Sequence, residues 1–352
     1  MTAATAGPDA GPIPAPPVAA GHPADVRQDR AGRGGDRRAD ADPAILEGFR
    51  VELTGYAYRM LGSVFDAEDA VQETMLRAWR GLDRFDGRSS LRTWLYRIAT
   101  NVCLDLLRGQ GRRALPTDLG EPSAPVAASL GAPGSGREWL GPAPDARVLP
   151  ADPAELAVTR ESVRLAFVAA LQHLPPRQRA VLILRDVLRW RAGEVAELLD
   201  TSVAAVTSAL QRARATMADR EAAAPVAALD REHRELLDRY VQVFERYDID
   251  ALVALLREDA VHSMPPYRLW LRGAADIGRW LTGPGAGCRG SRLLPVAANG
   301  APALAQFRPD PAGGHRAFSI QLVATSGGRI SRLTHFLQPR LFPLFGLPDR
   351  LP

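Results

Sequence analysis

The sequence predicts a multi-domain protein with two all-α domains followed by an α+β domain. The segments 43–108 and 153–221 carry apolar residues at the three- and four-residue spacing of helices. The segment 231–352 begins with the same spacing and then shows short apolar runs broken by Gly and Pro. Helices that precede a group of strands in this way are typical of α+β domains.

Three further segments lack any apolar period. Residues 1–42 are rich in Ala, Pro, Gly, Asp and Arg, so we expect a disordered N-terminal extension. Residues 109–152 are again rich in Gly, Pro and Ala, which predicts a flexible linker. A short Ala- and Pro-bearing stretch, 222–230, predicts a second linker.

The composition narrows the class of protein. The formal net charge is +4 and every basic residue other than histidine is arginine, which permits a nucleic-acid partner and equally fits a GC-rich coding sequence. Cys103 and Cys288 are too far apart for a zinc site or a disulfide framework, and the histidines are scattered, so we expect neither metal nor cofactor. We find no signal peptide and no apolar run long enough for a membrane helix, so we expect a cytoplasmic protein.

An acidic amphipathic helix is expected over 66–80. Asp66 is placed to cap its N-terminus, with further acidic residues in the first turn. Its apolar stripe comprises Ala70, Val71, Met75, Ala78 and Trp79. The opposite face is solvated or meets a partner.

The stretch 85–108 is a polar loop around Gly87 that leads into a helix with two unlike faces. One face, which requires a core, holds Leu91, Trp94, Leu95, Ile98, Ala99, Val102 and Leu106. The other holds Arg92, Thr93, Tyr96, Arg97, Thr100, Asn101 and Arg108. Cations, amides and an aromatic ring on one face suit phosphates and unstacked bases, with Tyr96 as the stacking candidate.

Two short helices joined by a polar turn are expected over 192–217, which describes a helix-turn-helix. On the second helix, Val203, Val206, Leu210, Ala213 and Met217 are expected to point inward. The exposed face combines small residues with Gln and Arg, which allows close approach to a major groove; it holds Ala204, Thr207, Ser208, Gln211, Arg212 and, at its edge, Arg214. Taken alone, the pattern also fits a plain helical hairpin.

The acidic helix, with Asp-Ala-Glu-Asp-Ala-Val-Gln-Glu-Thr, is followed by Phe-Asp-Gly-Arg-Ser-Ser-Leu-Arg-Thr-Trp-Leu-Tyr-Arg-Ile-Ala-Thr-Asn. This order resembles region two of bacterial RNA polymerase sigma factors, in particular the extracytoplasmic function (ECF) group. The resemblance implies that the acidic helix docks on the clamp helices of the polymerase largest subunit through Asp69, Gln72, Glu73 and Arg77. It implies that the loop and next helix capture and melt the minus-ten promoter element through Arg88, Ser89, Ser90, Arg92, Tyr96, Arg97 and Asn101.

The run Leu-Pro-Pro-Arg-Gln-Arg-Ala-Val-Leu-Ile-Leu-Arg-Asp-Val-Leu and the helix after Ser202 resemble sigma region four. That region binds the minus-thirty-five element and the polymerase flap, which assigns the exposed face of the helix-turn-helix to promoter DNA. Asp200 stands where the family often has glycine, and aspartate tolerates a left-handed backbone acceptably. The ECF group likewise has a linker in place of the helical middle region.

The segment 231–352 resembles the cone-shaped SnoaL-like fold, which follows region four in the sigma-G-like subgroup. Expected strands are Arg292–Ala298, Ala303–Arg308, Ala317–Thr325 and Arg329–Leu337. Such cones enclose a pocket, and its candidate lining residues, each of which is more simply explained by core packing, are His262, Tyr267, Trp270, Arg272, Trp280 and His335. The resemblance implies a domain that tunes activity, with a small molecule as its candidate ligand.

The sequence therefore predicts a sigma factor that binds core RNA polymerase and promoter DNA, and is not an enzyme. One alternative is a ligand-gated repressor that uses only the helix-turn-helix, but it leaves the acidic helix without a role. Another is an enzyme in which 231–352 is catalytic. The absence of a recognisable acid/base pair argues against it.

Overall fold

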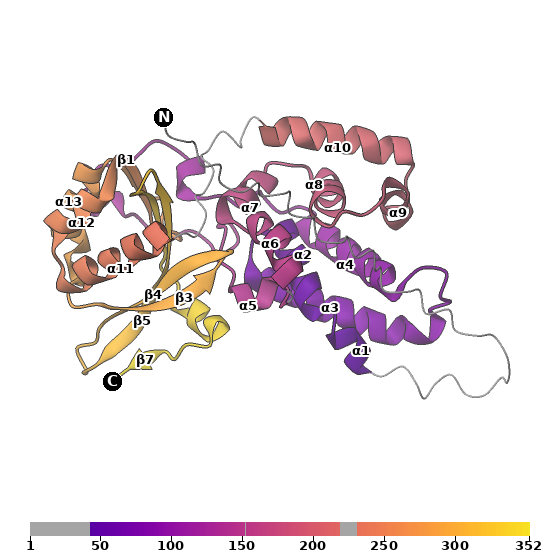
Figure 1. Ribbon diagram of the computed structural model, residues 1–352, viewed down its shortest axis with the longest axis horizontal. Coiled ribbons are helices and arrows are strands. Elements are labelled where there is room, and N and C mark those ends of the chain that lie inside the picture. The colour runs from indigo at the N-terminus through magenta and orange to yellow at the C-terminus, as the bar shows by residue number, and fades with distance from the viewer. Residues whose placement is uncertain (1–42, 152, 219–230) are drawn as a thin grey trace, which may run out of the picture. The chain divides into compact units, whose positions relative to one another are not determined.

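The computed structural model describes residues 43–151, 153–218 and 231–352. The expected disordered extension and the expected linker 222–230 lie outside these residues. The first helical block contains a short α1 (Pro43–Glu47), α2 (Arg50–Leu61), α3 (Val64–Gly81) and α4 (Leu91–Leu107), with a 3₁₀ turn η1 (Leu82–Arg84) after α3 (Figure 1).

The helices α2, α3 and α4 pack around a shared core that includes the fully buried Leu53, Val71 and Leu95. The N-termini of α3 and α4 are capped by serines, because the Ser63 hydroxyl accepts from the Asp66 N–H and the Ser90 hydroxyl accepts from the Thr93 N–H. The expectation that Asp66 caps α3 was therefore wrong by three residues.

Residues 109–151, expected as a flexible linker, instead form defined short elements: η2 (Pro116–Asp118), η3 (Ala127–Ser129) and α5 (Asp145–Val148). Trp139 and Leu140 are buried, and Gly141 accepts a hydrogen bond of 2.8 Å from the Tyr58 hydroxyl of α2. These apolar residues are isolated and follow no helical or strand period, so the sequence pattern did not reveal that each would be buried against another part of the chain.

The second helical block comprises α6 (Pro153–Ser162), α7 (Leu165–Leu171), α8 (Pro176–Leu182), a π-helical turn η4 (Ile183–Val187), α9 (Ala192–Leu198) and α10 (Val203–Ala218). Helices α9 and α10 form the expected helix-turn-helix. Asp200 in its turn has φ +50°, which confirms that aspartate takes the left-handed conformation there. Val203, expected to point inward, is 50 % exposed because it begins α10 one turn before the buried stripe.

The C-terminal domain opens with α11 (Arg231–Arg246) and α12 (Ile249–Leu255). Its sheet has the order β2-β1-β6-β5-β4-β3, with β7 paired to β5. The strands are β1 (Leu256–Ser263), β2 (Trp270–Arg272), β3 (Arg292–Ala298), β4 (Ala301–Pro309), β5 (His315–Ser326), β6 (Arg329–Phe336) and β7 (Arg350–Leu351). All four expected strands are present, as β3 to β6.

The sheet is antiparallel except where β1 runs parallel to β6. Helices α11, α12 and α13 (Ala274–Thr282) lie on one face of it (Figure 1). Two 3₁₀ segments, η5 (Pro284–Cys288) and η6 (Pro339–Phe345), complete the domain. On the other face Phe307 of β4 meets Phe342 of η6, with ring centroids 4.9 Å apart.

Asn299, in the turn between β3 and β4, joins the C-terminal domain to the helical blocks. Its amide nitrogen donates to the Tyr58 hydroxyl at 2.6 Å and to the Val163 carbonyl at 2.7 Å. Its amide oxygen accepts from the Ala143 N–H at 3.1 Å. A single buried side chain thus connects α2, the 109–151 segment and the turn between α6 and α7.

Candidate nucleic-acid interface

The exposed face of α10 matches the sequence prediction. Ala204, Thr207, Ser208, Gln211 and Arg212 are all exposed, whereas Val206, Leu210, Ala213 and Met217 are buried beneath them. Arg214, predicted at the edge, is exposed but pairs with Asp186 at 2.7 Å. Small side chains beside Gln and Arg leave the helix able to approach base edges closely.

The loop before α4 is also accessible. Arg88 and Ser90 are exposed, Ser89 is half-buried, and Gly87 has φ +70°, a conformation that favours glycine. Arg88 pairs with Asp86 at 2.9 Å, an exposed contact that a phosphate could replace at little cost. Asn101 is exposed near the other end of α4.

Tyr96, predicted to stack on bases, is fully buried. Its ring lies 5.2 Å from Tyr56 and 5.0 Å from Trp190, a residue of the turn before α9. Burial raises the pKa of its hydroxyl well above the usual value. The prediction of an outward-facing Tyr96 was wrong, because the second helical block supplies an apolar surface, at Trp190, that a helical wheel cannot show.

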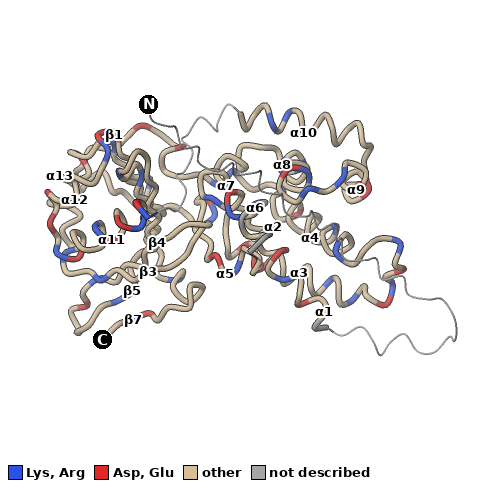
Figure 2. Tube along the Cα trace, viewed as in Figure 1, with Lys and Arg blue, Asp and Glu red and all other residues tan. Residues whose placement is uncertain are grey.

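The two arginines that flank Tyr96 are engaged as well. Arg92 pairs with Glu52 of α2 at 3.0 Å, and its guanidinium carbon lies 5.6 Å from the Trp190 ring centroid. Arg97 donates to the side chain of Glu197 of α9 at 3.4 Å and to its backbone carbonyl at 3.3 Å. Figure 2 shows basic and acidic residues along α4 and α9, with further arginines on α10. No local sequence pattern marks the partner residues Trp190, Glu52 and Glu197, so they were not predicted.

The face of α3 predicted for the polymerase is accessible. Asp69, Gln72 and Arg77 are exposed, and Glu73 pairs with Arg77 at 2.6 Å. Trp79, predicted in the apolar stripe, is instead 63 % exposed, and Leu76 is 40 % exposed. Their neighbour Ala78 fills the core position, so the larger side chains are left at the surface, which is where partner-binding proteins place apolar anchors.

The residues predicted for a pocket in the cone do not converge as one group. His262 on β1 and His335 on β6 are buried with ring centroids 4.5 Å apart. Trp270 directs its indole N–H to the Gly120 carbonyl of the 109–151 segment at 3.0 Å, and Arg272 lies over its ring. Trp280 belongs to the core, and Tyr267 is half-buried.

The histidine pair carries unsatisfied hydrogen-bonding groups. Within the described part of the chain, three ring nitrogens have no hydrogen-bond partner: Nδ1 and Nε2 of His262, and Nε2 of His335. Burial lowers the pKa of His262 to about 4, and burial together with His262 lowers that of His335 well below its usual value. Both rings are therefore neutral at neutral pH.

None of the described helices combines the length and apolar character needed to cross a bilayer.

Comparison with known proteins agrees with this geometry. Residues 46–113 match Sigma-70 region 2, residues 164–217 match Sigma-70 region 4, and residues 237–333 match a SnoaL-like domain. The ECF RNA polymerase sigma factor SigG of Mycobacterium tuberculosis is 49 % identical over 90 % of this chain and 86 % of its own length. SigJ of the same organism is 31 % identical over 68 % of this chain and 71 % of its own length.

The crystal structure of SigJ shares the fold, with a TM-score of 0.57 at 24 % identity over 87 % of this chain and 99 % of that one. These relatives do not favour the alternative of a stand-alone repressor, since each of them is named as an ECF RNA polymerase sigma factor. The chain belongs to the ECF RNA polymerase sigma factors, which bind the polymerase and recognise promoters, and it carries a C-terminal SnoaL-like domain.

Proposed function

We propose that the exposed face of α10 reads the minus-thirty-five element and that Arg88 to Asn101 capture the minus-ten element. The observation that carries the first part is the exposure of Gln211 and Arg212 beside small residues. The second part is supported by the accessible loop around Gly87, which leaves room for an unstacked base. Arg92, Tyr96 and Arg97 become available only after α9 and Trp190 move away from α4.

We further propose that α3 docks on the clamp helices of the polymerase largest subunit and that region four meets the flap. Asp69, Gln72, Glu73 and Arg77 supply the polar contacts, while Leu76 and Trp79 supply the apolar anchor. Trp79→Ser should weaken co-purification with core RNA polymerase, whereas Trp280→Phe, a core change in the cone, should not. Equal recovery of both variants would refute this docking surface.

The C-terminal domain is proposed as a regulator that shifts the balance between covered and uncovered α4. This proposal is supported by the hydrogen bonds of Asn299, which join the domain to α2 and to the turn between α6 and α7. We place no catalysis in the cone, because a histidine with a pKa of about 4 is a weak base. A small molecule that satisfies the nitrogens of His262 and His335 is the proposed ligand, and the protein is proposed to act in the cytoplasm.

Reconstituted transcription on duplex and pre-melted templates tests the promoter assignment. Arg88→Glu should reduce transcription from duplex DNA more than from a template already open at minus-ten, because the loop acts in strand capture. Arg212→Glu should reduce both, and Arg239→Glu on the exposed side of α11 should reduce neither. An Arg88→Glu defect of the same size on both templates would contradict the melting role.

A further inference from the structure

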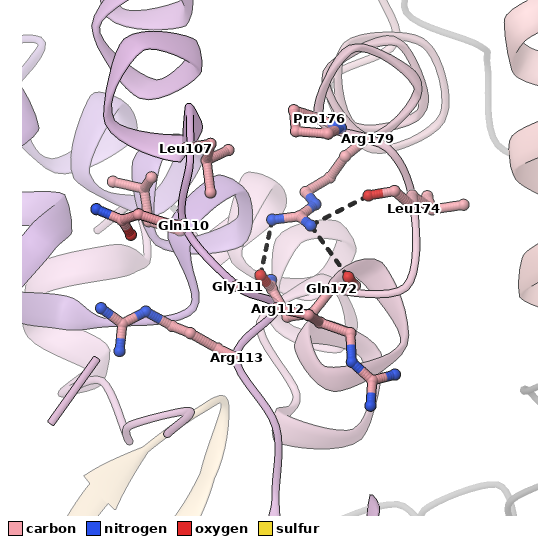
Figure 3. Close-up of a pocket in the computed structure, with 10 residues that line it drawn as sticks. Leu107, Gln110, Gly111, Arg112, Arg113, Gln172, Leu174, Pro176 and Arg179 are labelled. Carbon is pink, nitrogen blue, oxygen red and sulfur yellow. Dashed lines mark hydrogen bonds between the residues drawn. The ribbon is translucent and has the colours of Figure 1, made fainter. Parts of the chain in front are cut away.

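A cavity of about 170 Å³ lies where the first helical block, the 109–151 segment and the second helical block meet (Figure 3). Leu107 at the end of α4 and Pro176 at the start of α8 both line it. Three arginines and two glutamines line the space, and none of its lining residues is acidic: Arg112, Arg113, Arg179, Gln110 and Gln172. A polar cavity with this charge is suited to an anion.

Arg179 is a buried cation without a counter-ion. Arg179 is only 3 % exposed to solvent. Among the described residues, no carboxylate lies within ion-pairing distance of its guanidinium group. It donates instead to the Met60 carbonyl, to the Gln172 amide oxygen at 2.7 Å and to the carbonyls of Gln172 and Leu174 at 3.2 and 3.1 Å. Its Nε has no partner.

The charge of Arg179 persists in this setting. Burial lowers its pKa to about 10, which still leaves the guanidinium protonated at neutral pH. An uncompensated charge of this kind is unfavourable, and a bound anion would remove much of the penalty.

The other two arginines, Arg112 and Arg113, differ in whether their positive charge is already paired with a carboxylate. Arg113 is already paired with Asp66 and donates to the carbonyls of Gly136 and Trp139. It therefore lines the cavity but is not available to bind an anion. Arg112 is exposed and lies against the ring of His173. The cavity therefore has uncompensated positive charge from Arg179 within and Arg112 at its edge.

The volume limits the size of the anion. A cavity of about 170 Å³ is smaller than the pockets of roughly 300 Å³ or more that hold drug-sized ligands. A group with one or two phosphorus atoms fits this volume, and guanidinium and amide N–H groups are its usual donors. The base and ribose of a nucleotide would have to remain outside.

We propose that this cavity is a binding site for a small phosphoryl anion, of the size of inorganic phosphate or pyrophosphate. Because Leu61 and Leu107 come from the first block while Gln172 and Arg179 come from the second, the complete site exists only while the two blocks pack together. Bound anion therefore stabilises the arrangement in which α9 covers α4. That consequence rests on the proposed function, whereas the binding itself does not.

Calorimetric titration of the full chain with inorganic phosphate and with pyrophosphate, at ionic strength held constant with chloride, tests the binding. Saturable binding is expected. Gln110→Glu, which places a carboxylate at the exposed edge, should weaken it by about tenfold or more through charge repulsion. Gln242→Glu makes the same change at an exposed position of α11 and should leave the affinity unchanged.

Arg112→Gln should weaken binding without disturbing the core, which keeps the test valid if a variant of the buried Arg179 fails to fold. Adenosine monophosphate should bind more weakly than phosphate, because its sugar and base exceed the cavity. No saturable signal over chloride, unchanged affinity in Gln110→Glu, or tighter binding of the nucleotide would each overturn the site. If phosphate binds normally but does not alter promoter opening, the site stands and only its regulatory consequence fails.

Discussion

Helices α10 and α4 are both proposed to read promoter DNA, yet they differ in how available they are. The face of α10 from Ala204 to Arg212 is open to solvent. The corresponding face of α4 is occupied, since Tyr96 is buried against Trp190 and Arg97 contacts Glu197. One of the two proposed DNA-binding surfaces is thus exposed, while the other is covered by the protein's own second helical block.

The chemistry of the two surfaces explains the difference. The α10 face consists of small residues together with Gln and Arg, whose side chains are readily solvated. The α4 face, which is proposed to bind unstacked bases, combines an aromatic ring with cations, and that combination also packs on Trp190 and Glu197. A surface with the composition proposed for binding exposed bases is therefore also suited to being covered by the protein itself.

The largest effect is expected on the open surface. Arg212→Glu should weaken binding of holoenzyme to minus-thirty-five DNA by about 1–3 kcal/mol, since a favourable contact becomes a repulsive one. Anisotropy with a labelled promoter duplex at fixed salt measures this. Arg239→Glu, exposed on α11, is the matched control. Similar affinities for the two variants would remove α10 from the interface.

A second change tests what holds the covered surface in place. Asn299→Ala removes the hydrogen bonds to Tyr58, Val163 and Ala143 and leaves buried polar groups unsatisfied. The free energy of unfolding should fall by about 1–3 kcal/mol in a urea titration. Asn101→Ala, an exposed site, should change it by less than about 0.5 kcal/mol. Equal losses would show that Asn299 does not secure the junction.

Acid should loosen the cone before it affects α10. The folded-state pKa of His262 is about 4, below its unfolded value of about 6.5, so protons favour the unfolded state. The contribution of His262 is complete above about pH 6.5 and declines as the pH falls toward 4. Hydrogen exchange across this range should show β1 losing protection, and His262→Gln should reduce the pH dependence whereas His315→Gln should not.

A smaller effect is expected at the contact between α9 and α4. Glu197→Gln removes a half-exposed ion pair with Arg97, which is worth less than about 1 kcal/mol. Binding of a single-stranded minus-ten oligonucleotide to the full chain should therefore rise by no more than about fivefold. Glu121→Gln, exposed in the 109–151 segment, should leave it unchanged. Weaker binding by Glu197→Gln would contradict the covering role.

The smallest effect is expected in the turn that leads to α10. Asp200 has φ +50°, where glycine is less strained, so Asp200→Gly should change the free energy of unfolding by less than about 1 kcal/mol. Asp200→Val should lower the melting temperature clearly, because a β-branched side chain resists this conformation. Equal melting temperatures for the two variants would mean that the turn relaxes freely.

The local pattern predicted the helices, four of the strands and the open face of α10, because each follows from periodicity within one element. Burial that depends on a distant partner was not predictable in this way. Tyr96 is covered by Trp190, and Trp139 is buried far from any apolar period. Trp79 shows the reverse error, since the smaller Ala78 takes the core position beside it.

The position of Trp190 has a practical consequence. Its indole is only 7 % exposed and rests between Arg92 and Tyr96, at the seam between the two helical blocks. Separation of the two helical blocks would expose the Trp190 ring to solvent and shift its fluorescence emission to longer wavelength. The molecule thus carries an intrinsic optical probe at the seam, and a Trp190→Phe difference spectrum would follow opening without any attached dye.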